Sequence, residues 1–463
     1  MLKCDDTTKI NDKKCELSNN YDNRLYLFRA KYDNNVNINM LTLNFNNKRV
    51  INMNMMQNRN YWFSSGYLIT FYAAWSLWWS FYAIWLKSKI GLSGEELGIV
   101  YAANSAAAMC FMIFYGIIQD KLQIGKAVIT FQSIVMILIG PFLIYVYEPL
   151  LRNDFLLGVC IGAPVLSAGF ISGCALIDSF IERISRLFGF EFGPARFWGS
   201  FGYAAATFVA GILFGIDPHI NFWMASGVAA IYFIINLVYK PNQEFSANSE
   251  TQAVIQKPTI PTLSEILSLF GMKKFWLFVF FIIGTNSFYT IYDQQLFPNF
   301  YTSFFDKPEE GYQIYGYLNS FQVFLEAACM ILAPFFINKI GAKKSLLVAA
   351  MVMICRISLS ATLDNVCLIS LVKLFHAIET PLFILAVFKY VVGNFDERLS
   401  STLYLVGFNI SSNIGVIVLS WLVGKLFDKT GYSTTFYVLA SIVLFILIIA
   451  IFTLSDDKKT KQP

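Results

Sequence analysis

The feature that most constrains this chain is a series of apolar runs, many of them close to the ~20 residues that a helix needs to cross ~30 Å of hydrocarbon. Charged residues make up only 14% of the sequence, whereas a soluble domain carries about 25%. The pattern predicts an all-α membrane protein with twelve transmembrane helices, near residues 61–86, 96–119, 127–147, 156–181, 197–216, 220–239, 275–303, 312–337, 345–363, 366–392, 400–422 and 432–454.

The predicted spans form two groups of six around a polar, proline-containing central segment. Similar residues follow the second span of each group, at Gly116–Lys126 and at Pro334–Lys344, as expected for a transporter built from two repeated halves. Beyond the N-terminal segment we therefore predict a six-helix bundle at 59–239, a cytoplasmic linker at 240–274, a second six-helix bundle at 275–455 and a cytoplasmic tail at 456–463.

The N-terminal segment, residues 1–58, has a different composition from the rest of the chain. It is rich in Asn, Asp and Lys and has no apolar core of the signal-peptide type. Such a segment cannot bury enough apolar surface to order itself. Met53, Met55 and Met56 stand just before the first span, so we expect a misannotated extension with the natural start there, or else a disordered cytoplasmic tail.

Lysine and arginine are unevenly shared between the predicted loops. Cytoplasmic loops carry an excess of these residues, and the richer set here comprises the C-terminal end, the central segment and the loops after spans two, four and eight. We expect a multi-pass protein of the bacterial inner membrane with both termini in the cytoplasm. The net charge of +5 is scattered, which argues against a nucleic-acid partner.

Several ionisable residues fall inside predicted spans, where each charge costs at least ~2.5–3.5 kcal/mol. Lys373, His376 and Glu379 are spaced i, i+3, i+6, along one face of span ten, and such a carboxylate–imidazole pair can take up and release protons. A single pair could be structural, Asp293 with Lys373 above all. The whole set predicts a substrate or ion pathway: Asp178, Arg196, Asp293, Glu326, Arg356, Lys373, His376 and Glu379.

Aromatic residues crowd the first span, where Trp78 and Tyr82 are four residues apart, as are Trp75 and Trp79. Aromatic faces pack well against the C–H faces of sugar rings, and their polar atoms can bond hydroxyls. An interfacial belt is the alternative, and Trp85 fits it. For the tryptophans nearer mid-membrane, Trp75, Trp78 and Trp79, we favour a sugar-binding pore, and we take Trp78 and Tyr82 as candidate sugar-binding residues.

With these residues assembled, the chain resembles the oligosaccharide:proton symporters of the major facilitator superfamily, over about residues 60–455. Four strings carry the resemblance: Trp75–Lys87 (WSLWWSFYAIWLK), Asp293–Pro298 (DQQLFP), Tyr315–Val323 (YGYLNSFQV) and Leu371–Glu379 (LVKLFHAIE). The resemblance is strongest to the sucrose-transporting branch of that family.

The resemblance implies roles for individual residues. Asp178 and Arg196 match the pair that holds the sugar, and Tyr203 stands where lactose-transporting members have a tryptophan that stacks on the sugar. Glu379 matches the proton-carrying carboxylate. Arg356 matches its basic neighbour, and His376 the residue that links the sugar and proton sites.

The chain also departs from the lactose-transporting members. Val323 replaces a sugar-contacting glutamate, and an acid stands one turn later as Glu326, which we take as a candidate sugar-binding residue although its role is left open by this departure. An ion pair between spans seven and eleven is replaced at both ends, by Thr290 and about Ser412, which avoids an uncompensated buried charge.

The predicted function is sucrose/proton symport by alternating access, with a disaccharide, a proton and the bilayer as the partners of a functional monomer. Raffinose, melibiose, maltose or lactose could replace sucrose, and a non-transporting sugar sensor is the rival outside this class. An enzyme is not expected, because only His219 and His376 are available as histidines and no P-loop motif is present. No cofactor or metal is expected, because the eight cysteines include no CxxC pair.

Overall fold

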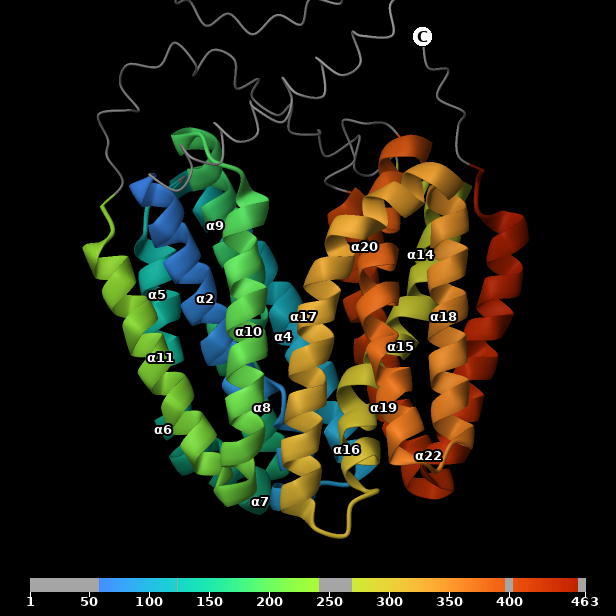
Figure 1. Ribbon diagram of the computed structural model, residues 1–463, viewed down its shortest axis with the longest axis horizontal. Helices are drawn as coiled ribbons and strands as arrows, with labels where there is room; N and C mark the ends of the chain where they lie inside the picture. The colour runs from blue at the N-terminus through green and yellow to red at the C-terminus, as the bar shows by residue number, and fades with distance from the viewer. Residues whose placement is uncertain (1–57, 123, 241–268, 396–402, 457–463) are drawn as a thin grey trace, which may run out of the picture. The chain divides into compact units, whose positions relative to one another are not determined.

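The structure is a computed structural model that describes residues 58–122, 124–240, 269–395 and 403–456, and every regular element in these ranges is helical (Figure 1). The predictions for residues 1–57, for most of the 240–274 linker and for 457–463 lie outside the described residues. The helices, with η marking wider π-type turns, are α2 (Arg59–Trp79), α3 (Tyr82–Ile84), η1 (Trp85–Ile90), α4 (Gly94–Leu122), α5 (Ala127–Ile137), α6 (Ile139–Phe142), η2 (Leu143–Tyr147), α7 (Glu148–Asn153), α8 (Phe155–Leu166), η3 (Ser167–Ile171), α9 (Gly173–Phe188), α10 (Phe192–Ile216), α11 (Pro218–Val238), α14 (Lys273–Ile282), η5 (Ile283–Ser287), α15 (Phe288–Thr290), η6 (Ile291–Leu296), α16 (Phe297–Thr302), α17 (Pro308–Ile340), α18 (Ala342–Thr362), α19 (Val366–Leu374), α20 (His376–Asn394), η8 (Tyr404–Ile410) and α22 (Ser411–Thr453).

Twelve membrane passages can be traced through these elements. Nine helical segments of the described chain are long and apolar enough to cross a bilayer, and a bent pair, Ala127–Ile137 with Ile139–Asn153, makes ten. One of the nine, Tyr404–Thr453, is two passages, because the backbone turns at Gly431 with φ 74°. The first passage, α2, completes the twelve and is an unbroken helix of 21 residues. Its mean hydropathy is low because hydropathy scales rate tyrosine and tryptophan as weakly apolar. The predicted twelve-helix fold is confirmed.

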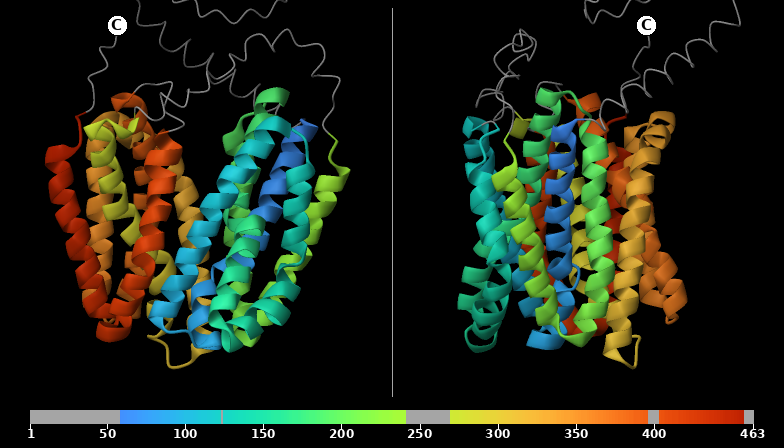
Figure 2. Two further views of the ribbon diagram at one scale, coloured as in Figure 1. Left: turned by 180° about the vertical axis from the view of Figure 1, so that it is seen from behind. Right: turned by 60° about the vertical axis from the view of Figure 1, so that its left-hand side comes forward.

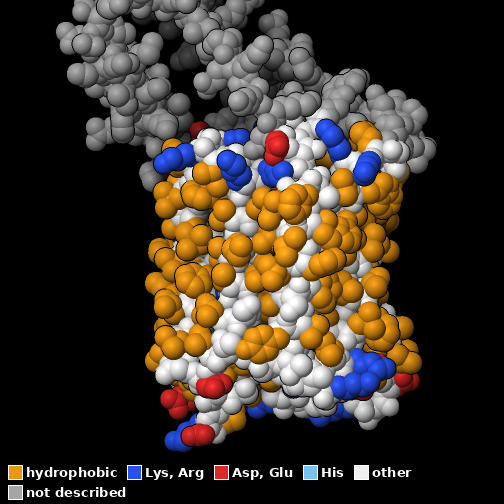
Figure 3. Space-filling model, turned by 90° about the vertical axis from the view of Figure 1, so that its right-hand side faces the viewer, with side chains coloured by type: hydrophobic (Ala, Val, Ile, Leu, Met, Phe, Trp, Pro, Cys, Tyr) orange, Lys and Arg blue, Asp and Glu red, His pale blue; other side chains and the backbone are white. Residues whose placement is uncertain are grey.

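The surface has the distribution expected of a protein in a bilayer. A broad band of apolar side chains separates charged groups gathered at the two ends (Figure 3). Large apolar residues project from it, including Ile331, Phe335 and Phe452, which are 69%, 72% and 82% exposed. Exposed apolar area on this scale is stable only against lipid or a partner.

The helices form two bundles, α2–α11 and α14–α22, and the first helix begins on the same face as the last one ends (Figures 1 and 2). Two close crossings join the bundles, one of α4 with α22 and one of α10 with α17. Small residues make both possible. A Cβ on Gly98 would overlap the carbonyl oxygen of Ser420, and one on Gly316 would lie 2.8 Å from the Cα of Gly211. Small residues let helix backbones approach closely in membranes.

A carboxylate from the second bundle also caps a helix of the first. Asp428 on α22 accepts hydrogen bonds from the backbone N–H groups of Gly94 (2.7 Å) and Glu95 (2.8 Å), at the start of α4. An anion at a helix N-terminus satisfies free N–H groups and interacts favourably with the helix dipole. This cap and the α4–α22 crossing hold the bundles together at the end where α4 begins.

We expect Gly98→Leu to weaken closure at that end, because the added side chain must push α22 away. Overpacking costs about 1–3 kcal/mol, which is roughly a 5- to 150-fold shift between open and closed forms. The measurement is the rate at which a membrane-impermeant maleimide labels a cysteine placed at Val323, which lines the cavity between the bundles. Weaker closure should make this labelling faster. Gly116→Leu is the matched control, because a Cβ at this position of the same helix meets nothing within 4 Å. Equal labelling rates for the two variants would refute this account of closure.

Candidate functional site

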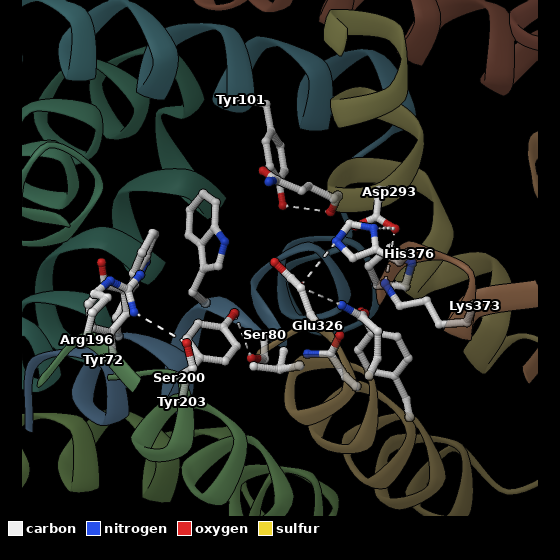
Figure 4. Close-up of a pocket in the computed structure, with 18 residues that line it drawn as sticks. Tyr72, Ser80, Tyr101, Arg196, Ser200, Tyr203, Asp293, Glu326, Lys373 and His376 are labelled. Atoms are coloured by element: carbon white, nitrogen blue, oxygen red, sulfur yellow. Dashed lines mark hydrogen bonds and ion pairs between the residues drawn. The ribbon is translucent and has the colours of Figure 1, made fainter. Parts of the chain in front are cut away.

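A cavity of about 250 Å³ lies between the two bundles (Figure 4). Helices of the first bundle supply aromatic groups and one arginine to its wall, whereas the second bundle supplies acids, amides and cations. The lining residues are Tyr72, Trp75, Trp79, Ser80, Tyr101, Arg196, Ser200, Tyr203, Asp293, Gln294, Pro298, Tyr315, Asn319, Gln322, Val323, Glu326, Lys373 and His376.

Arg196 on α10 is held in place from two directions. Its Nε donates to Asp178 Oδ2 on α9 at 3.2 Å, and its guanidinium carbon lies 4.0 Å from the centre of the Tyr72 ring. Tyr72 in turn donates its hydroxyl to Asp178 Oδ2 at 3.0 Å. Arg196 lines the cavity, while Asp178 lies behind it. The carboxylate and ring therefore orient a planar cation whose other N–H groups can serve a ligand.

The aromatic wall of the cavity uses two of the four first-span aromatic residues that we predicted for the pore or for sugar binding. Trp75 and Trp79 line the cavity, together with Tyr203. Trp78 and Tyr82 are each only 1% exposed and lie behind this wall. Trp78 packs edge-on against Phe170, and the Tyr82 hydroxyl bonds that of Tyr147 at 2.8 Å. Trp78 and Tyr82 therefore support the aromatic wall from behind and do not line the cavity.

Arg356, fully buried on α18, is the centre of a charge cluster in the second bundle. Its Nη1 donates to Glu379 Oε1 at 2.6 Å and its Nη2 to Asp293 Oδ1 at 2.5 Å. Lys373 Nζ lies 3.1 Å from the same Asp293 oxygen. The predicted Asp293–Lys373 contact is thus present, but Arg356 shares the carboxylate and Asp293 also lines the cavity. The pair is therefore continuous with the candidate site.

His376 stands between this cluster and the cavity. Its Nδ1 lies 3.0 Å from Arg356 Nη1, and since arginine can only donate, Nδ1 must accept. The ring proton of the neutral histidine is therefore on Nε2, which faces Thr380 Oγ1 at 3.3 Å and Glu326 Oε2 at 3.9 Å. One nitrogen meets the buried cluster while the other meets an acid of the cavity wall.

Glu379 is the most enclosed acid of the cluster. Its side chain is 0% exposed, and while Oε1 accepts from Arg356, Oε2 has no hydrogen-bond partner among the described residues. A buried polar oxygen that has no donor is costly, and more so when its carboxyl group is ionised. This free oxygen can carry a proton without breaking an existing hydrogen bond.

Neutral groups occupy the place of the missing ion pair between spans seven and eleven. The side-chain Nδ2 of Asn286 donates to Ser412 Oγ at 2.7 Å, and Thr290 donates its hydroxyl to the backbone carbonyl of Asn286 at 2.8 Å. Neutral amide, hydroxyl and backbone groups therefore make the hydrogen bonds here, and neither end leaves a charge unbalanced.

Several lining residues are absent from the sequence-based candidates, among them Asn319, Gln322 and Gln294. Asn319 and Gln322 lie on one face of α17 together with the candidate Glu326, at i, i+3 and i+7, and that spacing was available as a signal. Asp293 and Gln294 both line the cavity although they are consecutive. They lie in the π-type turn η6, and such turns are frequent at functional sites, but sequence alone does not locate them.

Comparison with known proteins agrees with this architecture. A profile of the LacY proton/sugar symporter family matches residues 53–462. The sucrose permease of Escherichia coli is 48% identical over 403 residues, which cover 87% of this chain and 95% of that permease. The raffinose permease of Escherichia coli is 35% identical over 407 residues, covering 88% and 95%. The solved structure of the nucleoside transporter NupG aligns with a TM-score of 0.70 over 86% of this chain and 100% of its own, and at 16% identity it shows the fold alone.

Fold, cavity and buried charges together define a membrane transporter of the major facilitator type. The chain belongs to the LacY proton/sugar symporter family. It is therefore a proton-coupled sugar symporter and not an enzyme, as the sequence predicts, and its co-substrate is the proton.

Proposed function

We propose that this protein imports sucrose together with a proton by alternating access of the cavity between the bundles. The 48% identity to a sucrose permease supports this choice of sugar. The observation that carries the proposal is that the two walls of the cavity present different chemical groups. An oriented arginine and aromatic faces suited to a sugar lie on one wall, and a buried acid–arginine–histidine cluster lies behind the other.

We assign sugar contact to Arg196, Tyr203, Trp75 and Trp79, with Asp178 holding the arginine. The indole N–H of Trp75 supports this, since it is buried without an acceptor among the described groups and is available to a sugar hydroxyl. Trp78 and Tyr82 are assigned to supporting the aromatic wall. We propose that Glu326 contacts the sugar and His376 at the same time, and so connects the sugar site to the proton site.

Proton transfer is assigned to Glu379, with Arg356 and His376 as its partners. Charge balance supports one proton per cycle. With His376 neutral, the two cations Arg356 and Lys373 face three acids, Asp293, Glu326 and Glu379. A single added proton makes this group neutral, which is the least costly state for charges inside a membrane.

The cytoplasmic side is assigned to the face where α2 begins and α22 ends. Residues near that face include most of the basic groups outside the cavity, among them Lys126, Arg183, Lys274, Lys339 and Lys344, as the positive-inside rule requires. The cap by Asp428 is then on the outer side, so this conformation is closed outward. One chain supplies the whole cavity, which supports a functional monomer with domains at 59–239 and 275–455.

A panel of sugars tests this proposal against its rivals. Vesicles containing the purified protein should show counterflow of radiolabelled sucrose, and unlabelled sucrose should compete better than raffinose, melibiose, maltose or lactose. Stronger competition by one of these four would reassign the substrate. Binding of sucrose without any counterflow would indicate a sensor and refute transport.

A further inference from the structure

Gln322 is a buried amide on the cavity wall whose hydrogen bonding is half complete. Its side chain is 2% exposed, and its Nε2 donates to Glu326 Oε2 at 3.2 Å. Its Oε1 has no donor among the groups that the structure describes. A buried acceptor left without a donor destabilises a protein, so this oxygen is a candidate for a ligand's hydroxyl group.

Glu326 fixes which way the amide points. A carboxylate accepts hydrogen bonds, so the amide nitrogen must face it and the carbonyl oxygen must face elsewhere. Glu326 is itself oriented by its position between this amide and His376 Nε2. The acceptor is therefore held in place before any ligand arrives, which is the arrangement that gives selectivity at least entropic cost.

The two walls of the cavity come from different bundles. Arg196 belongs to α10 of the first bundle and Gln322 to α17 of the second. In Figure 4, Arg196 lies with Tyr72 on one side of the cavity, and Asp293, His376 and Lys373 lie on the other with Glu326 between. A ligand with two sugar rings can engage both walls at once.

We propose that Gln322 is a specificity-determining residue whose carbonyl oxygen accepts a hydrogen bond from one hydroxyl on the sugar ring farther from Arg196. The proposal rests on the proposed disaccharide transport. A site built to bond a hydroxyl discriminates strongly against a ligand that lacks it, because the buried group is then unpaired. A hydrogen-bond acceptor also prefers a hydroxyl group to a hydrogen or a methyl group at the same position. A flat aromatic wall does not make this distinction.

A cycle of ligand and side-chain deletions tests this directly. Binding of a set of monodeoxy sucroses is measured for the parent protein and for Gln322→Met, which keeps the length of the side chain and removes its polar atoms. One analogue should bind the parent roughly 10- to 100-fold more weakly than sucrose, and this penalty should largely vanish in Gln322→Met. In Arg196→Lys, removing the same hydroxyl should still weaken binding by the same factor, because that variant affects the other ring.

Phe324→Leu is the matched control, since this residue of the same helix is 50% exposed toward the membrane, and its penalties should equal those of the parent. A common weakening of all analogues in Gln322→Met would mean that the residue only positions Glu326, and it would overturn the assignment. If sucrose binds but no deoxy analogue loses its penalty in Gln322→Met, the role given to Gln322 is wrong and the proposed function still stands. If the parent bound no disaccharide, the proposed function would fail and Gln322's role with it.

Discussion

Glu379→Gln should exchange sugar across the membrane at a near-normal rate and yet fail to accumulate it. The amide imitates a permanently protonated carboxyl: it keeps the shape of the side chain and an oxygen for Arg356 Nη1, now 2.6 Å from Glu379 Oε1. Exchange needs no loss of the proton, whereas net uphill transport does. We expect accumulation to fall to the equilibrium level while exchange stays within a few-fold of the parent.

The assay pairs exchange and uphill uptake in the same vesicles under an imposed proton gradient. Glu148→Gln is the control, because Glu148 pairs with Arg152 at 3.0 Å and with His219 at 3.0 Å, away from the cavity. That variant should accumulate sugar normally. Normal accumulation by Glu379→Gln would show that Glu379 is not the obligatory proton carrier, and Glu326, Asp178 or His376 would be tested next.

Arg196→Lys should reduce sugar binding roughly 10- to 150-fold. Hydrogen bonds to charged groups contribute about 1.5–3 kcal/mol, and an ammonium cannot reproduce the planar fork of donors. It would also lose the contact over the Tyr72 ring, whose centre lies 4.0 Å from the guanidinium carbon. Asp178→Asn should act in the same direction, since it removes the charge that orients the arginine.

Equilibrium binding of labelled sucrose to purified protein measures this effect. Arg152→Lys is the matched control, because Arg152 is 45% exposed and belongs to a surface pair, which contributes little. Thermal unfolding of each variant, followed alongside, separates loss of binding from loss of structure. Parent-like affinity in both Arg196→Lys and Asp178→Asn would refute the role given to this pair.

The helices could be predicted from sequence because each is encoded by its own run of apolar residues. The predicted span 366–392, for example, corresponds to α19 and α20 at Val366–Leu374 and His376–Asn394. The interruption between them could not be predicted. It falls at Phe375, two residues from Lys373 and four from Glu379.

The charged groups of the site could also be predicted, because a charge within an apolar run is conspicuous. Pairs such as Asp293 with Lys373 could be predicted as well, but the sharing of one partner by several groups could not. Nothing in the sequence says that Arg356 bonds Asp293 and Glu379 at once, since these residues belong to three different passages. Uncharged lining residues such as Gln322 escaped notice, because an amide in a membrane helix is less conspicuous than a charge.

The aromatic wall shows a different limit. Trp75 and Trp79 share one face of α2, and Trp78 of α2 packs with Tyr82 at the start of α3. Both pairs have helical spacing, so periodicity cannot decide which pair meets the cavity. The decision is made by the neighbours: Phe170 and Tyr147 cover the second pair.

The most direct test of the account is the coupling of sucrose movement to a proton gradient. Purified protein is reconstituted into vesicles, the outside is made acidic relative to the inside, and internal labelled sucrose is followed with and without a protonophore. We expect sucrose to rise above its external concentration and to fall back to equilibrium when the protonophore is added. Sucrose that only equilibrates, at the same rate with and without the gradient, would contradict proton-coupled import.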